Sequence, residues 1–118
     1  MQNPFGPKKM TDIMIIAPAT GNTISKLSRG ITDTPALMAA KSHLRNQNNL
    51  VIAISTNDGL SSSAPSIASL LNKKNIFFVP FRQDNPITKP TSLVFSPEHI
   101  IPALEMALDN EQIQPLLL

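Results

Sequence analysis

Three continuous apolar runs stand out along the chain, at residues 13–17, 50–54 and 76–81. They read Ile-Met-Ile-Ile-Ala, Leu-Val-Ile-Ala-Ile and Ile-Phe-Phe-Val-Pro-Phe, so none alternates apolar with polar residues. Continuous runs rich in β-branched residues are typical of strands that are buried on both faces, as in parallel sheets. The pattern therefore predicts three strands of a parallel sheet.

Helical segments are expected between these runs. Asn22 or Thr23 can cap a first helix that extends to about Arg29, and Gly30 ends it. This helix follows the first strand directly. The sequence therefore predicts a strand-to-helix turn immediately after residue 17.

A second helix is predicted from Thr34, which caps it with Pro35 at its first position, to about Asn46. A third is expected to start after Ser63 and to end near Lys73. Both lie between predicted strands, and parallel strands need such crossover connections. The order of elements therefore indicates an α/β fold.

The last part of the chain is predicted as a loop and a helix. Residues 82–90 are polar and proline-bearing, which favours a long loop. A fourth helix is expected between Pro97 and Leu108. Its start is ambiguous, because a start at Ser96-Pro97 would place Pro102 inside the helix and kink it. Since three strands make only a small sheet, its edges need cover by a partner or by further chain.

Composition bounds the class of protein. The chain has 118 residues, of which 42% are hydrophobic and 15% charged, so we expect one globular domain with a short polar lead at residues 1–10. The net charge of +2 is spread without a basic stripe, and Trp and Tyr are absent, which gives nucleic-acid binding little support.

Location is constrained in the same way. Cysteine is absent, which excludes disulfides and fits a reducing compartment. The polar start lacks the apolar core of a signal peptide, and no apolar run approaches the roughly 20 residues of a membrane span. We therefore expect a cytoplasmic protein that does not bind membranes.

Candidate chemistry lies in the loops that follow the strands. In open α/β sheets, ligands bind beyond the carboxyl ends of the strands. The first such loop combines small residues, hydroxyls and an amide at the start of a helix, an arrangement that suits an anion, and its glycine lets a ligand approach the backbone closely. Its residues are Pro18, Ala19, Thr20, Gly21, Asn22 and Thr23.

Further candidates are Ser55, Thr56 and Asn57 after the second strand, and Asp33 between the first two helices. The alternative is structural: Thr20, Asn22 and Thr23 only cap a helix, and the Asn-Asp-Gly sequence of the second loop is an ordinary turn. No metal-ligand spacing, carboxylate pair or Ser-His-Asp order is present. His43 and His99 are expected to be half-buried or solvated side chains.

The stretch Pro18-Ala-Thr-Gly-Asn-Thr resembles the Pro-Ala-x-x-Asn-Thr signature of the flavoprotein superfamily, which includes phosphopantothenoylcysteine decarboxylase. Segments across nearly the whole chain also resemble the family of dipicolinate synthase B subunits. Among them are Ala53-Ile-Ser-Thr-Asn-Asp-Gly-Leu and Lys74-Asn-Ile-Phe-Phe-Val-Pro-Phe. The resemblance implies a three-layer Rossmann-like flavoprotein fold, of which residues 1–118 form a single partial domain, the carboxy-terminal part.

The resemblance also implies a function. Such a chain acts with an NADPH-dependent oxidoreductase A subunit to form dipicolinate from dihydrodipicolinate, in the mother cell of a sporulating bacterium. It implies an FMN-type site, with Asn22 as the best candidate for a catalytic residue, and a homo-oligomer. Two alternatives stay open: a non-catalytic flavin-binding or docking module, and a flavin-dependent decarboxylase.

Overall fold

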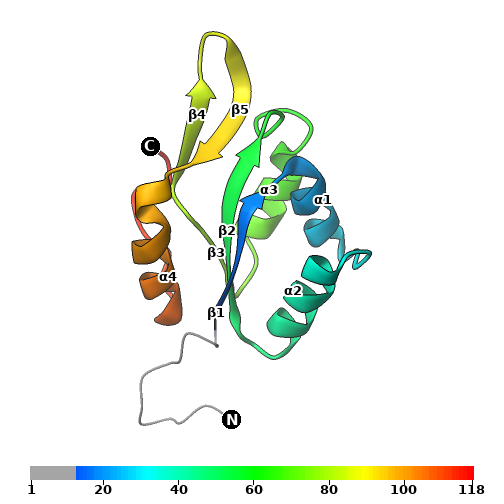
Figure 1. The fold of residues 1–118 in the computed structure, drawn as a ribbon. Coiled ribbons are helices and arrows are strands. Elements are labelled where there is room, and N and C mark those ends of the chain that lie inside the picture. The colour runs from blue at the N-terminus through cyan, green and yellow to red at the C-terminus, as the bar shows by residue number, and fades with distance from the viewer. Residues whose placement is uncertain (1–12) are drawn as a thin grey trace.

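The structure, a computed structural model, describes residues 13–118, and the polar lead expected at residues 1–10 lies outside the described residues. This part of the chain contains five strands, four α-helices and one 3-10 helix (Figure 1). In chain order the elements are β1 (Ile13–Ala19), α1 (Gly21–Arg29), α2 (Pro35–Arg45), β2 (Asn49–Thr56), α3 (Ala64–Leu71), β3 (Ile76–Phe78), β4 (Phe81–Asn85), β5 (Lys89–Phe95), η2 (Pro97–His99) and α4 (Ile100–Leu108).

Strand β2 is the centre of the sheet. It pairs in parallel with β1 on one side, in the register Ile15↔Val51. On its other side, its first half pairs in parallel with β3, and its last residues pair antiparallel with β5, in the register Ser55↔Val94. The predicted parallel core of three strands is therefore confirmed, and two further strands extend it.

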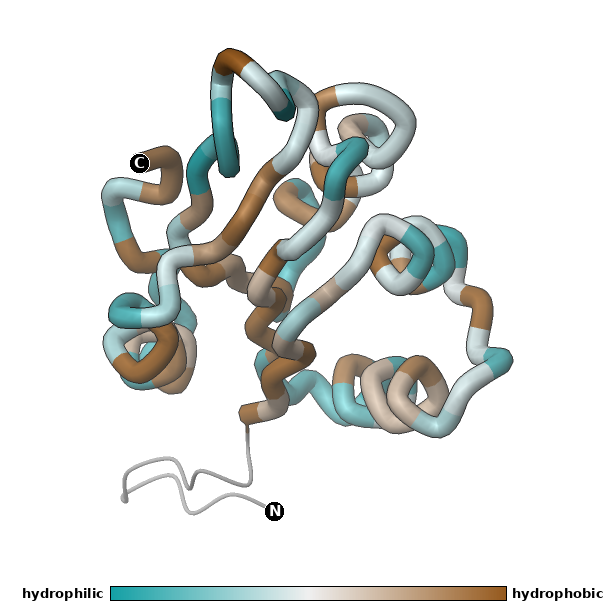
Figure 2. The backbone as a smooth tube through the Cα atoms, turned by 45° about the horizontal axis from the view of Figure 1, so that its top comes forward, coloured by the Kyte–Doolittle hydropathy of each residue, from teal (hydrophilic) through white to brown (hydrophobic). Residues whose placement is uncertain are grey.

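The prediction of a loop at residues 82–90 was wrong. Strands β4 and β5 form an antiparallel hairpin there, and the predicted third strand stops at Phe78, before Val79 and Pro80 lead into β4. Both faces of the hairpin arm are exposed from residue 82 to residue 90, so its sequence carries no apolar alternation that would reveal strands. Figure 2 shows hydrophilic residues along this arm and a hydrophobic segment at its tip, where Ile87 is 91% exposed.

Helix starts follow capping chemistry. The hydroxyl of Thr34 accepts the Leu37 N–H at 3.2 Å, as the sequence predicts. Helix α1 begins slightly earlier than expected, because Thr20 rather than Asn22 or Thr23 is its cap. Gly30 ends α1 with a φ of 73°, a left-handed conformation that glycine adopts without strain.

Helix α4 avoids the kink expected at Pro102. The segment begins as a 3-10 turn, and α4 proper starts at Ile100, so that Pro102 lies in its first turn. The N–H groups of a first helical turn have no partner within the helix, so a proline there removes no hydrogen bond. The helix therefore continues to Leu108.

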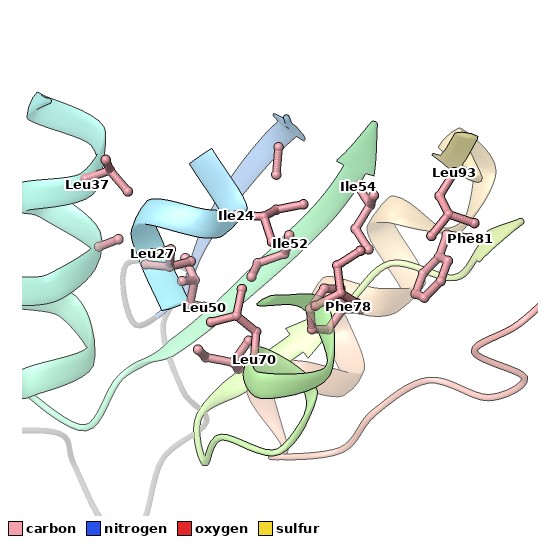
Figure 3. Close-up of a cluster of buried hydrophobic side chains, with 14 residues drawn as sticks. Ile24, Leu27, Leu37, Leu50, Ile52, Ile54, Leu70, Phe78, Phe81 and Leu93 are labelled. Carbon is pink, nitrogen blue, oxygen red and sulfur yellow. The ribbon is translucent and has the colours of Figure 1, made fainter. Parts of the chain in front are cut away.

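Alternate side chains of β2 point to opposite faces, and each face is covered. Leu50, Ile52 and Ile54 pack against the helices α1, α2 and α3 in one apolar cluster (Figure 3). Val51 and Ala53 pack against α4 on the other face. The result is three layers, helices–sheet–helix, which confirms the predicted α/β class (Figure 1). None of the helices in residues 13–118 has the length and apolar character that crossing a membrane requires.

Candidate functional site

The loops after β1 and β2 meet around one cleft of about 340 Å³. Because β1 and β2 are parallel neighbours, their carboxyl ends reach the same edge of the sheet (Figure 1). The first loop contributes the start of α1, and the second contributes the end of β2 and the turn that follows. The lining residues are Thr20, Gly21, Asn22, Ser55, Thr56, Asn57 and Asp58.

Asn22 is the most available side chain of the first loop. It is exposed, it lies in the first turn of α1, and its amide makes no hydrogen bond within residues 13–118. Asn57 is also exposed, while its carbonyl accepts the Thr91 hydroxyl at 2.8 Å. That bond fastens the second loop to β5, so the two loops are held in place by different parts of the fold.

Asp58 organises the inner wall of the cleft. One carboxyl oxygen, Oδ1, accepts the Thr56 hydroxyl at 2.5 Å and the Ser63 hydroxyl at 2.8 Å, and both donors are buried. The hydrogen bond from Thr56, followed by that from Ser63, holds the pKa of Asp58 below its usual value, against a smaller opposing effect of burial. Asp58 is therefore ionised at neutral pH.

Gly21 packs directly against this cluster. A Cβ atom at Gly21 would lie 2.7 Å from Asp58 Oδ1, 2.7 Å from Ser63 Oγ and 2.8 Å from Thr56 Oγ1. The glycine therefore brings the start of α1 against the chain's own carboxylate. The sequence predicted a close approach at Gly21 but assigned it to a ligand.

The other candidate residues lie around the cleft rather than in its lining. Pro18 is exposed, and Ala19 is 1% exposed within the core cluster of the α1–α3 face. Thr23 Oγ1 accepts the Thr20 hydroxyl at 3.3 Å. Asp33 forms an ion pair with Lys26 of α1 at 2.9 Å. Its carboxylate is not among the residues that line the cleft.

Sequence reasoning missed Asp58 and Ser63 as parts of the site. Both stand in the stretch Thr56-Asn-Asp-Gly-Leu-Ser-Ser-Ser63, which has the composition of an ordinary turn. The one signal in the sequence was that the hydroxyl residues Thr56 and Ser63 flank Asp58. Ordinary turns and helix caps show the same arrangement. Within residues 13–118, no three acidic or histidine side chains gather where they could hold a metal ion.

Both histidines are half-buried, which agrees with the expectation from the sequence. His43 is half-buried, and its Nε2 atom lies 2.8 Å from the carbonyl oxygen of Asn49. His99 is also half-buried, with Nδ1 2.7 Å from the hydroxyl of Ser96 at the start of η2. Neither histidine is among the residues that line the cleft.

Known proteins share both the sequence and the fold. The chain is 47% identical over 114 residues to the B subunit of dipicolinate synthase from Bacillus subtilis strain 168, an alignment that covers 97% of this chain and 57% of that protein. The crystal structure of the corresponding B subunit from Bacillus halodurans C superposes with a TM-score of 0.90 at 50% identity. The superposition covers 98% of this chain and 59% of that one.

The chain thus spans somewhat under three fifths of the length of both relatives, 57% and 59%. Within that span, the fold of the described residues and their order agree with a flavoprotein of the Rossmann-like type. A sequence profile described as Flavoprotein matches residues 5–91, which include both loops of the cleft. The chain belongs to the flavoprotein family.

Proposed function

We propose that the chain acts as the B subunit of a dipicolinate synthase. In this function it works with an oxidoreductase A subunit that uses NADPH, and together they form dipicolinate from dihydrodipicolinate during sporulation. The observation that supports the proposal is the 47% identity to the Bacillus subtilis protein along 97% of the chain. The cytoplasm of the mother cell is the proposed location.

The cleft supports a flavin as the ligand. Family membership implies such a cofactor, and FMN is the form that we propose. The hydroxyls, amides and backbone groups that line the cleft suit the polar edge of a flavin ring, with Asn22, Ser55 and Asn57 as the residues that would hold it. When bound, a flavin supplies electron transfer, while the residues of this chain bind and orient the ring.

Replacing Asn22 by Ala tests the proposed function. Loss of a ligand hydrogen bond of about 1.4 kcal/mol should lower dipicolinate formation about tenfold in the presence of the A subunit. Because Asn22 is exposed, its replacement should change stability by less than about 0.5 kcal/mol. Dipicolinate is measured by its absorbance, and stability by thermal unfolding.

The matched control is Asn72→Ala, which removes an exposed asparagine at the far end of α3. It should leave dipicolinate formation unchanged. Equal synthesis by the Asn22→Ala, Asn72→Ala and unaltered chains would remove Asn22 from the mechanism. Absence of dipicolinate with the unaltered chain and the A subunit would refute the proposed function itself.

A binding or docking module is the second candidate. It is supported by the lining of the cleft, in which Asp58 is the only residue with an ionisable side chain. In this interpretation, the loops hold a ligand or dock the partner, and the A subunit performs all the chemistry. Flavin titration by fluorescence separates the two: co-purification with the A subunit without any flavin response favours docking.

We further propose that the chain forms homo-oligomers. The outer edge of β1 has no strand partner within residues 13–118, and Ile13–Ile16 are only half-buried there. Apolar edge strands favour pairing with another chain. Light scattering coupled to size-exclusion chromatography should give a mass of at least twice 12.8 kDa. A mass of 12.8 kDa would contradict the proposal.

A further inference from the structure

The cleft carries a negative charge. Of the seven residues that line it, Asp58 is the only one with an ionisable side chain, and none is Lys, Arg or His. On α1, Lys26 is paired with Asp33. A phosphate or carboxylate that entered the cleft would therefore meet a carboxylate without a compensating cation.

A carboxylate of the chain itself lies at the start of α1. Helix N-termini favour anions, and α1 has no acidic residue in its own first turn. Asp58 Oδ1 approaches to within 2.7 Å of the Cβ position of Gly21, the first residue of α1. The position that the sequence assigned to an anionic ligand is thus next to the carboxylate of this chain.

Asp58 uses only one of its two carboxyl oxygens in hydrogen bonds within the described part of the chain. Both side-chain donors, Thr56 and Ser63, bond to Oδ1, whereas Oδ2 has no hydrogen-bond partner within residues 13–118. The hydroxyls also fix the orientation of the carboxylate, because they approach it from β2 and from the residue that precedes α3. An oriented acceptor with a full charge prefers N–H donors.

From this geometry we propose that Asp58 determines which part of the ligand enters the cleft. It accepts a hydrogen bond from an N–H group on the edge of an uncharged heteroaromatic ring, and it repels phosphate and carboxylate groups. The inference rests on the proposed flavin site and refines it.

Lumiflavin, the flavin ring without a ribityl phosphate, is the probe that tests this. The unaltered 118-residue chain should bind it, as measured by fluorescence quenching, and inorganic phosphate should not compete. Asp58→Asn, which keeps the shape of the side chain and loses the charge, should weaken lumiflavin binding by about tenfold or more, because it loses a hydrogen bond to a charged group. Phosphate should then compete with lumiflavin for the variant.

Asp84→Asn is the matched control, since it removes a carboxylate from the hairpin arm and not from the cleft. Its lumiflavin affinity should equal that of the unaltered chain. Circular dichroism checks that each variant is folded, and the competition by phosphate on the unaltered chain requires no variant.

Three results would overturn the inference: competition by phosphate on the unaltered chain, equal lumiflavin affinity in Asp58→Asn, or no lumiflavin binding by the unaltered chain. Dipicolinate formation with the A subunit is measured beside these titrations. If synthesis persists while any of the three results is found, only the assignment of Asp58 fails. If the unaltered chain gives no synthesis but Asp58→Asn loses lumiflavin, the proposed function fails and the assignment stands.

Discussion

Gly21 stands where the structure leaves no room for a side chain. Three oxygen atoms surround its Cβ position at 2.7–2.8 Å, and two of them belong to buried hydroxyls. Gly21→Ala should therefore force the Asp58 loop away from α1 and lower the free energy of unfolding by about 1–3 kcal/mol. Urea unfolding followed by circular dichroism measures this change.

The neighbouring variant Asn22→Ala provides the comparison, since it alters an exposed side chain of the same turn. Alanine favours helices more than glycine does, so propensity alone would make Gly21→Ala stabilising. A variant as stable as the unaltered chain would show that the Asp58 loop moves aside without cost.

The ionised state of Asp58 links stability to pH. Its pKa in the folded chain is lowered from the ordinary value of 3.8, so the stabilisation is complete above that value and is lost as the pH falls through the folded pKa. Asp58→Asn should therefore be less stable than the unaltered chain at pH 7, and the difference should shrink below about pH 4. Unfolding midpoints in urea, taken at neutral pH and on both sides of the ordinary pKa, give the comparison. A difference that stays constant with pH would contradict the assignment.

At the scale of single elements, local chemistry predicts helices better than exposed strands. Thr34 with Pro35 marks the start of α2 correctly, since capping depends on residues within one turn. The β4–β5 hairpin depends instead on pairing with the distant strand β2, and its arm is polar on both faces. Its turn is held by Asn85, whose side-chain oxygen accepts the Ile87 and Thr88 N–H groups, a signal too common in loops to reveal strands.

Strand β3 depends on a side chain for its outer edge. Gln112 Oε1 accepts the Phe78 N–H at 2.8 Å, and its Nε2 donates to the Phe78 carbonyl at 2.7 Å, so one amide pairs with both backbone groups. Gln112→Ala leaves both backbone groups of the fully buried Phe78 without a partner. The change should lower the free energy of unfolding by about 1–3 kcal/mol. Thermal unfolding measures the loss.

Gln83→Ala is the control for this variant. Its side chain also donates to a backbone carbonyl, that of Pro90, but the bond lies on the exposed hairpin. Water can replace such a bond, so the change should stay within about 0.5 kcal/mol. Equal losses in the two variants would mean that the edge of β3 is open to water.

At the scale of the whole molecule, the convergence of the two loops was predictable. Parallel strands that are joined by helices bring their carboxyl ends to one edge, and the residues after both strands line the cleft as a result. The position of the Asp58 carboxylate in the cleft was not predictable, because it depends on Asp58, Ser63 and Gly21 meeting in space. Nor was the ion pair of Asp33, since the turn between α1 and α2 decides which way that carboxylate points.

Strand β2 also constrains how the chain can be made. Its apolar run 50–54 is fully buried, yet the residues that complete its sheet, Leu93 and Val94, and those that cover its second face, Ala103 to Ala107, are synthesised much later. During synthesis, the second face of this strand stays uncovered until residues 103–107 have emerged from the ribosome. A nascent chain that has passed residue 54 but not residue 103 therefore exposes a continuous apolar strand, the kind of segment that favours aggregation.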